Sequence, residues 1–471
     1  YKLKNGLTVY LNEDHNETSA FGAIVVRGGG KRDPKDATGI AHYLEHMLFK
    51  GTQTMGTIDY EAESVYLDSI AIKYDQLGKI EDDSLRKAIQ NDINRLNLKA
   101  VEYAIPNEFD RLAEKMGGTW INAFTSDDNI AYFNKFPGNQ IEKWLDLYRQ
   151  RFNKPVFRLF QSELETVYEE KNRAADNFFR GIFDYFGKNF FKNHPYGQQD
   201  ILGTIDHLKN PSLTKMKEYY DTYYVANNMA LIICGDFDIE KTKPIIEEKF
   251  GTLPYSELPP TLNINEDKFN GREFISGRMS PMKLGVIGFR TVPANHKDKL
   301  GLRFIQEMLS NQYSTGLLDK LSVNNKLLGA GVWPMDNVDH GGLVFYYVPK
   351  LFFQSLTKAE KVVLKEVEKI KNGDFTESEL EVIRLGMNRD YQEQLENMQN
   401  RLFLFIDIFT KSTPWDDVAN YPQKIESITK EEVVEIANRY LGDNYLSLHS
   451  KTGLPKKVKL DKPPYDPAVP K

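Results

Sequence analysis

The chain has 471 residues, 41% of them hydrophobic and 27% charged, with a formal net charge of −6. Because this length exceeds one ordinary core, we predict two globular domains of roughly 200 residues each. Lys and Arg are mixed with Asp and Glu, and no run of about 18 apolar residues occurs, so we expect no nucleic-acid partner and no membrane span.

The first predicted elements are a strand at residues 21–27 (FGAIVVR) and a helix that carries the sequence GIAHYLEHML. The helix is expected to begin near Thr38, a residue type that caps helices, and to end at Lys50, before Gly51. Its core-facing stripe consists of Ile40, Leu44, Met47 and Leu48.

The same helix carries a histidine pair beside its apolar stripe. His42, Glu45 and His46 share one face, because residues three and four apart are neighbours on a helix. Two imidazoles one turn apart suit zinc, and a hydrolytic site adds a third ligand and an open position for water, whose pKa falls toward about 7. Glu45 is placed to accept the proton of that water. The order HxxEH is the inverted form of the HExxH signature, with the same residue types in the same roles. With 8 His in the chain, HxxEH is expected by chance in about one such chain in a hundred.

Two segments have more than one interpretation. Residues 57–116 are charged and helical in period, which predicts two antiparallel helices with apolar seams. We interpret them as a structural insertion, with a substrate-contacting arm as the alternative. The aromatic segment NFFRGIFDYFGKNFF, from Asn177, is typical of packing between a helix and a sheet, and the wall of an apolar chamber is the alternative.

A carboxylate on a second helix is the candidate third metal ligand. The segment QSELETVYEEKNRAADN predicts this helix, and on it Glu163 and Glu170 lie two turns apart on one face. Taken singly, each glutamate of the segment is typical of a solvated surface. The four glutamates are Glu163, Glu165, Glu169 and Glu170.

The sequence contains an internal repeat, which predicts two related halves. LGVIGFR at residues 284–290, followed by GLRFIQEML, repeats the first strand and helix. RYLGDNYLSLHSKTG, from Arg439, is a weaker counterpart of YYVANNMALIICGDFD, from Tyr223. The single cysteine, Cys234, lies in the latter apolar run, so we expect a buried structural thiol.

The predicted domain limits follow from this repeat and from composition. Residues 1–252 form the first, zinc-binding lobe with the helical insertion at about 57–116, and residues 270–453 form the second, non-catalytic lobe. Residues 253–269, rich in Pro, Asn and Glu, are the predicted linker. Residues 454–471 have five prolines and five lysines, so we interpret them as a tether without a core of its own.

Several motifs together resemble one known family. They are HYLEHMLFKGT from His42, the pair Glu163 and Glu170, GGTWINAFTSDDNIAYF from Gly117, HPYGQQDILGT from His194 and the strand ending ICGDFD. In these motifs the chain is similar to the pitrilysin and insulysin family of inverzincin zinc metallopeptidases, which includes mitochondrial processing peptidase. The motifs are spread over nearly the whole chain.

The resemblance implies a fold, an activity and site residues. The fold is α+β, with two homologous lobes that each have a mainly antiparallel sheet packed with helices. The activity is that of a zinc-dependent endopeptidase that hydrolyses short or unfolded peptides inside a closed chamber, with one Zn²⁺ per chain. Glu170 becomes the third ligand and Glu163 a supporting catalytic-site residue, while Asn122 and Ala123 align the substrate on an edge strand.

The sequence also departs from the family pattern. Arg303, Gln306 and Glu307 stand where the first lobe has its HxxEH residues, so we expect one metal site per chain. The family uses an Arg and a Tyr to position substrate, and Val323 and Ala330 stand at those places. We therefore expect a second homologous half or a partner subunit to supply the Arg/Tyr pair. The alternative function is a non-catalytic peptide-binding or structural subunit, and the resemblance suggests the bacterial periplasm or cell envelope.

Overall fold

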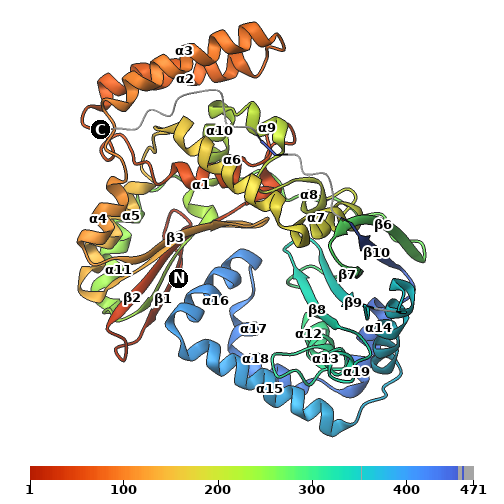
Figure 1. The fold of residues 1–471 in the computed structure, drawn as a ribbon. Helices are drawn as coiled ribbons and strands as arrows, with labels where there is room; N and C mark the ends of the chain where they lie inside the picture. The colour runs from red at the N-terminus through yellow and green to blue at the C-terminus, as the bar shows by residue number, and fades with distance from the viewer. Residues whose placement is uncertain (352, 454–458, 461–471) are drawn as a thin grey trace.

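In the computed structural model, which describes residues 1–351, 353–453 and 459–460, the chain forms two lobes built around two five-stranded sheets (Figure 1). In spatial order, the first sheet consists of β1 (Thr8–Glu13), β5 (Met229–Gly235), β2 (Ser19–Arg27), β4 (Asn129–Pro137) and β3 (Thr119–Thr125). The second consists of β6 (Arg272–Ser280), β10 (Tyr445–Thr452), β7 (Leu284–Thr291), β9 (Gly341–Val348) and β8 (Gly329–Asp336). In each sheet the first pair is parallel and the others are antiparallel. The predicted α+β fold of two homologous lobes is confirmed.

The helices of the first half lie between and after these strands. They are α1 (Ile40–Met47), α2 (Tyr60–Leu77), α3 (Asp83–Val101), α4 (Glu108–Lys115), α5 (Ile141–Arg151), α6 (Phe160–Asp176), α7 (Phe178–Phe190), α8 (Pro195–Gln198), α9 (Ile205–Lys209), α10 (Leu213–Tyr223) and α11 (Ile239–Phe250). Short 3₁₀ turns occur at Gly30–Arg32, Gly138–Gln140 and Ala226–Asn228. The charged segment 57–116 forms α2, α3 and α4, and α2 and α3 pack as a hairpin that projects from the first lobe (Figure 1).

The helices of the second half repeat part of this arrangement. They are α12 (Lys299–Leu309), α13 (Asp319–Val323), α14 (Leu356–Lys371), α15 (Glu377–Glu396), α16 (Met398–Lys411), α17 (Trp415–Ala419), α18 (Tyr421–Ser427) and α19 (Lys430–Tyr440). α12 follows β7 as α1 follows β2, which agrees with the internal repeat. Cys234 is fully buried in β5, as expected.

The first helix is shorter than predicted and is capped differently. It begins after Gly39, whose φ of 90° is left-handed, and its last helical residue is Met47 rather than Lys50. Thr38 does not cap it, because its hydroxyl contacts the His207 ring at 2.7 Å. Instead the carboxylate of Asp33 accepts the backbone N–H groups of Gly39 and Ala41 at 2.7 and 2.8 Å. A distant aspartate thus satisfies the free N–H groups at the start of α1.

The two halves exchange one helix each across the lobes. α16, from the second half, packs on the first sheet against β2 and β5, and α7, from the first half, packs on the second sheet against β6, β7 and β10. Phe186 and Phe190 of α7 are buried there, which favours packing over a chamber wall for these aromatic residues. The domain limits near residues 252 and 270 remain a prediction, and the exchanged helices tie the lobes together.

A pair of arginines holds the exchanged helices in matching ways. Arg27, at the end of β2, donates from Nε to the carbonyl of Phe409 in α16 at 3.0 Å. Arg290, near the end of β7, donates from Nε to the carbonyl of Phe190 in α7 at 2.8 Å. These arginines end the repeated segments FGAIVVR and LGVIGFR, so the repeat extends to the contact that each strand makes with its borrowed helix.

Residues 459 and 460, in the predicted tether, contact the first lobe. Residues 454–458 and 461–471 of the predicted tether lie outside the described residues. Leu460 is 5% exposed in the core of the first lobe, and its backbone N–H and carbonyl pair with the side chain of Asn172 in α6. This contact lies two residues along the chain from Glu170.

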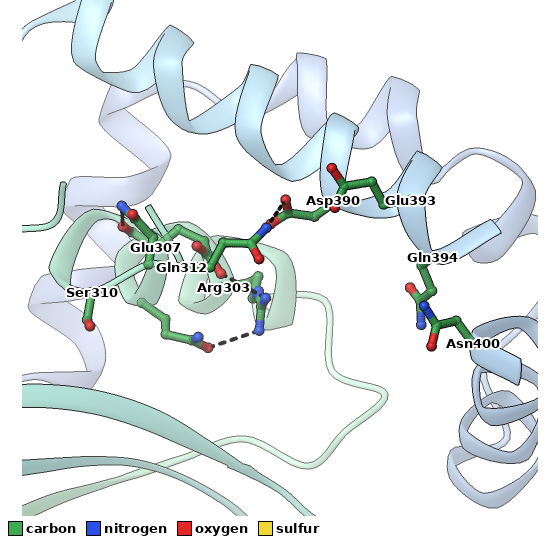
Figure 2. A pocket seen from close by; sticks show the side chains of 10 residues that line it. Arg303, Glu307, Ser310, Gln312, Asp390, Glu393, Gln394 and Asn400 are labelled. Carbon is green, nitrogen blue, oxygen red and sulfur yellow. Dashed lines mark hydrogen bonds and ion pairs between the residues drawn. The ribbon is translucent and has the colours of Figure 1, made fainter. Parts of the chain in front are cut away.

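At the place that α1 has in the first lobe, α12 borders a polar cavity of about 380 Å³ (Figure 2). Arg303 and Glu307 of α12 form an ion pair at 2.7 Å, and α15 contributes Asp390 and Glu393 to the lining. Among the described residues, the only cluster of His, Cys, Asp and Glu side chains able to hold a metal ion lies elsewhere, in the first lobe.

A buried ion pair fastens the α2–α3 hairpin beneath the loop after α1. Glu63 and Arg158 are at most 1% exposed and lie 2.9 Å apart, and Arg158 also donates to the carbonyls of Lys50, Thr52 and Met55. We expect Glu63→Ala to lower the free energy of unfolding by about 3–5 kcal/mol, because it leaves a buried guanidinium without its counter-ion.

Urea unfolding followed by circular dichroism measures this effect. The exposed neighbour Glu61 provides the control, since Glu61→Ala should change the free energy of unfolding by no more than about 0.5 kcal/mol. Equal effects of the two substitutions would contradict a structural role for the ion pair.

Candidate metal centre

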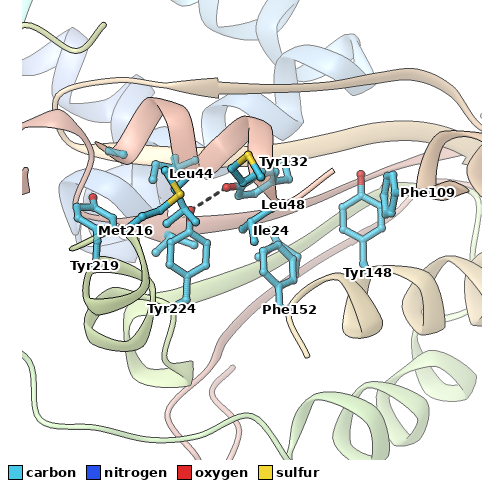
Figure 3. Close-up of a cluster of buried hydrophobic side chains, with 14 of the residues drawn as sticks. Ile24, Leu44, Leu48, Phe109, Tyr132, Tyr148, Phe152, Met216, Tyr219 and Tyr224 are labelled. Carbon is cyan, nitrogen blue, oxygen red and sulfur yellow. Dashed lines mark hydrogen bonds between the residues drawn. The ribbon is translucent and has the colours of Figure 1, made fainter. Parts of the chain in front are cut away.

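The buried face of α1 fixes the direction of its polar face. Leu44 and Leu48 are fully buried, and they pack in the same core as Ile24 of β2 and Tyr132 of β4 (Figure 3). Because the stripe of His42, Glu45 and His46 adjoins this apolar stripe, these side chains point to the edge of the core rather than to bulk solvent.

The second helix of the candidate site, α6, packs directly on α1. The hydroxyl of Tyr43 donates to the carbonyl of Phe160 at 2.5 Å, and the two rings stack with centroids 4.5 Å apart. Leu164 and Val167 bury the core face of α6, which leaves Glu163 and Glu170 turned to α1. The packing of the two helices thus brings the predicted carboxylates to the histidines.

His42, His46 and Glu170 converge on one point. Their ligand atoms all lie within 4.8 Å of one another, with Oε2 of Glu170 at 3.2 Å from Nε2 of His42 and 3.6 Å from Nε2 of His46. A tetrahedral zinc ion with ligand distances of about 2.0–2.2 Å separates neighbouring ligand atoms by roughly 3.4 Å. Two imidazole nitrogens and a carboxylate oxygen at these spacings fit zinc.

Glu163 contacts His46 at the ring nitrogen that is turned away from Glu170. Its Oε2 lies 3.3 Å from Nδ1 of His46, and its Oε1 lies 2.5 Å from Nζ of Lys50. A carboxylate on the far nitrogen of a metal-binding histidine fixes the orientation of the ring. Nδ1 of His42, in contrast, is buried and has no hydrogen-bond partner within the described part of the chain.

The protonation of this cluster without metal follows from its charges. Burial alone would lower the pKa of His46, but its hydrogen bonds to Glu163 and Glu170 outweigh burial and raise that pKa to about 9. Hydrogen bonds to His42 and His46 hold the pKa of Glu170 well below its ordinary value. Glu170 is thus already the carboxylate that a metal ion requires, whereas His46 carries a proton in the metal-free protein and must release it when an ion binds.

Glu45 lies beside the cluster and is only 8% exposed. Burial raises its pKa, although the hydroxyl of Thr125 donates to its Oε2 at 2.6 Å and acts in the opposite direction. Sequence reasoning missed Thr125, which lies at the end of β3. A hydrogen bond to Glu45 from a residue 80 positions away leaves no local pattern in the sequence.

The predicted substrate-aligning residues lie on β3, the edge strand of the first sheet. β3 pairs with β4 on one side and has no strand on its other side within the described chain. Asn122 and Ala123 line a cavity of about 580 Å³ together with His42, Glu45 and His46, and Glu163 and Glu170 line it too. All seven predicted site residues therefore border one space.

Two models of one peptidase family match the chain. Insulinase (Peptidase family M16) matches residues 8–66 and 89–204, and Peptidase M16 inactive domain matches residues 212–387. The chain belongs to peptidase family M16. The residues between the two matched parts of the first model, 67–88, lie in the α2–α3 hairpin.

One relative and one solved structure similar to this chain are named as proteases. The chain is 24% identical to the zinc protease PqqE of Helicobacter pylori over 453 residues, which cover 94% of this chain and 89% of that protein. Its fold matches a crystal structure of a protease from Helicobacter pylori with a TM-score of 0.78 and 22% identity, covering 96% of this chain and 98% of that one.

A third comparison concerns a longer protein. The periplasmic protease PqqL from Escherichia coli matches with a TM-score of 0.71 and 15% identity, over 96% of this chain and 47% of that chain. The present chain thus spans about half the length of PqqL. No helix in the described part of this chain is long and apolar enough to cross a membrane.

Two positions that the sequence singled out, Val323 and Ala330, lie in the second half. Val323, at the end of α13, is 73% exposed, and Ala330, in β8, is 7% exposed, so neither offers a polar group to a substrate. Within the described residues, the cavity beside the metal centre is lined by no tyrosine, and Arg180 is the single arginine among its lining residues.

Proposed function

We propose that this M16 chain is a zinc-dependent endopeptidase that hydrolyses short or unfolded peptides. The observation that carries the proposal is the convergence of His42, His46 and Glu170 on one point, with Glu45 beside them in the same cavity. Two nitrogen ligands, one oxygen ligand and a neighbouring carboxylate make up the donor set and base of a catalytic zinc site. The zinc protease names of relatives support this assignment.

Each residue has a defined task in the proposed reaction. Zinc held by His42, His46 and Glu170 would supply a Lewis acid that lowers the pKa of water toward about 7. Glu45 would accept a proton from the attacking water and deliver it to the leaving amide nitrogen. The raised pKa of Glu45 suits both steps, since a base must also release its proton.

The chain's edge strand would hold the substrate. β3 has no strand on its outer side within the described residues, so an extended peptide can add there as a further strand beside Asn122 and Ala123 without its sequence being read. This arrangement would place the scissile bond over the metal cavity, whose lining includes both β3 and the ligands. Glu163 would keep the His46 ring in position during this process.

A second homologous half or a partner subunit would complete the active site. This part of the proposal is supported by Val323 and Ala330, which stand where the family pattern has an Arg and a Tyr. PqqL, which is about twice as long as the matched region, provides an example of a protein with room for two such halves. Two halves would enclose the chamber. The periplasm or cell envelope is the proposed location, since PqqL is a periplasmic protease.

The zinc-loaded chain should cleave an unstructured, internally quenched peptide, and a chelator should abolish cleavage until zinc is restored. The same assay with an added homologous half, either fused or separate, should show faster cleavage, because the missing Arg would stabilise developing negative charge. Full activity of the isolated chain would contradict the partner proposal. No cleavage in either arrangement would favour the alternative of a non-catalytic peptide-binding subunit.

A further inference from the structure

A second cavity continues from the metal centre along α4. The metal-centre cavity measures about 580 Å³ and the neighbouring one about 560 Å³, and they share the lining residues Phe49, Asp110 and Ile121. Ile121 belongs to β3, and Asp110 belongs to the helix that leads into that strand. A peptide lying on β3 would therefore pass these three side chains.

The floor of the shared region is apolar and firmly supported. The fully buried guanidinium of Arg151 lies between two aromatic rings. Its Cζ is 3.9 Å from the ring centroid of Phe49 and 3.9 Å from that of Phe109. Arg151 also donates from Nε to the carbonyl of Leu48 at 3.2 Å. Phe49 thus presents a fixed apolar surface beside Ile121, because the residues behind it cannot move without opening the core.

Asp110 is the unsatisfied charge at this place. Its half-buried carboxylate makes no hydrogen bond or ion pair within the described residues, and burial raises its pKa against the opposing charges of Arg151 and Lys50. Lys50 pairs with Glu163 at 2.5 Å, and the guanidinium of Arg151 is buried among aromatic rings, where its two terminal nitrogens make no hydrogen bond within the described residues. The outer cavity adds one cation and one anion, Arg111 and Glu114.

We propose that Phe49, Ile121 and Asp110 form a specificity subsite for a lysine or arginine side chain of the peptide substrate. The aliphatic stem of such a side chain would cover Phe49 and Ile121, and its cationic end would pair with Asp110, as long basic side chains do at apolar surfaces with a polar rim. Asp110 is a specificity-determining residue in this scheme and takes no part in the chemical step. The inference rests on the proposed function, because it assumes a peptide on β3.

Peptide binding tests the subsite without catalysis. Fluorescent decapeptides that differ only by Lys, norleucine or Glu at one scanned position are titrated into the zinc-loaded Glu45→Gln variant. At one position, the Lys peptide should bind about tenfold tighter than the norleucine peptide. Adding Asp110→Asn should remove this difference, and Asp110→Lys should transfer the preference to the Glu peptide. Zinc content and melting temperature of each variant show whether it is folded.

A matched control removes a carboxylate elsewhere. Asp221→Asn on α10 deletes an exposed charge whose ion-pair partner among the described residues is Lys217, so it should leave the Lys preference unchanged. Equal affinity for Lys and norleucine peptides at every position, or a preference that persists in Asp110→Asn, would overturn the subsite.

Cleavage by the chain with Glu45 intact separates this inference from the proposed function. A Lys preference in binding without any cleavage contradicts the peptidase proposal and leaves the subsite standing. Cleavage of Lys and norleucine peptides with equal kcat/KM values overturns the subsite and leaves the peptidase proposal standing.

Discussion

Glu45→Gln should lower kcat for peptide cleavage by about 10²–10⁴-fold while the zinc content stays at about one ion per chain. Glutamine has nearly the same shape as glutamate, but it cannot accept the proton of the attacking water. The hydroxyl of Thr125 can still donate to the remaining oxygen, so the position of the side chain is retained. Steady-state kinetics with a quenched peptide and elemental analysis of the same preparation measure both quantities.

A matched substitution on the neighbouring ligand helix controls for loss of charge. Glu169 of α6 is exposed and adjoins Glu170 in sequence, and Glu169→Gln should leave both kcat and zinc content near those of the parent. If Glu45→Gln leaves a measured peptidase activity unchanged, Glu45 is not the base, and the non-catalytic peptide-binding subunit becomes the better hypothesis.

The motif residues were predictable because their chemistry is local. His42, Glu45 and His46 lie within five positions on one helix, where helical geometry alone places them together. Glu170 required more, because 124 positions separate it from His46 and only the resemblance to a family selected it among four glutamates. The packing of Tyr43 on Phe160 brings these helices together, and neither residue carries a sign of that contact in the sequence.

The supporting contacts were not predictable from the sequence for the same reason. Asp33 caps α1 from outside the helix, whereas the local signal pointed to Thr38. Capping by a residue several positions away depends on how the preceding loop folds back, and sequence rules describe only the residue directly before the helix. Helix α1 also ends at Met47, earlier than predicted, and the loop that follows it is held by Arg158, which donates to the carbonyl of Lys50.

The exchange of helices between lobes shows a limit of the repeat. FGAIVVR and LGVIGFR predicted equivalent strands, and the strand order of the two sheets agrees. The repeat does not indicate which sheet a helix covers, because an apolar stripe predicts that a helix is buried on one face but not against which sheet. The tertiary contacts, among them those of Arg27 with α16 and of Arg290 with α7, identify the sheet that each helix covers.

Glu170→Ala should reduce zinc from about one equivalent per chain to a small fraction after dialysis against a weak chelator. The carboxylate contributes the negative charge between His42 and His46, and two imidazoles alone leave the site one ligand short. Metal binding to the folded parent adds about 4 kcal/mol of stability at a free zinc concentration a thousandfold above Kd. The zinc-dependent rise in melting temperature should therefore disappear in Glu170→Ala.

Glu163→Gln distinguishes a ligand from a residue that only orients one. Glu163 contacts His46 at Nδ1, the nitrogen that faces away from the cluster, so its loss should weaken zinc affinity by about 10–100-fold without abolishing binding. Zinc affinity should therefore be highest in the parent, lower in Glu163→Gln and lowest in Glu170→Ala. If Glu170→Ala instead retains a full equivalent of zinc, Glu170 is not a ligand, and the convergence of the three side chains reflects an ion pair in the metal-free protein.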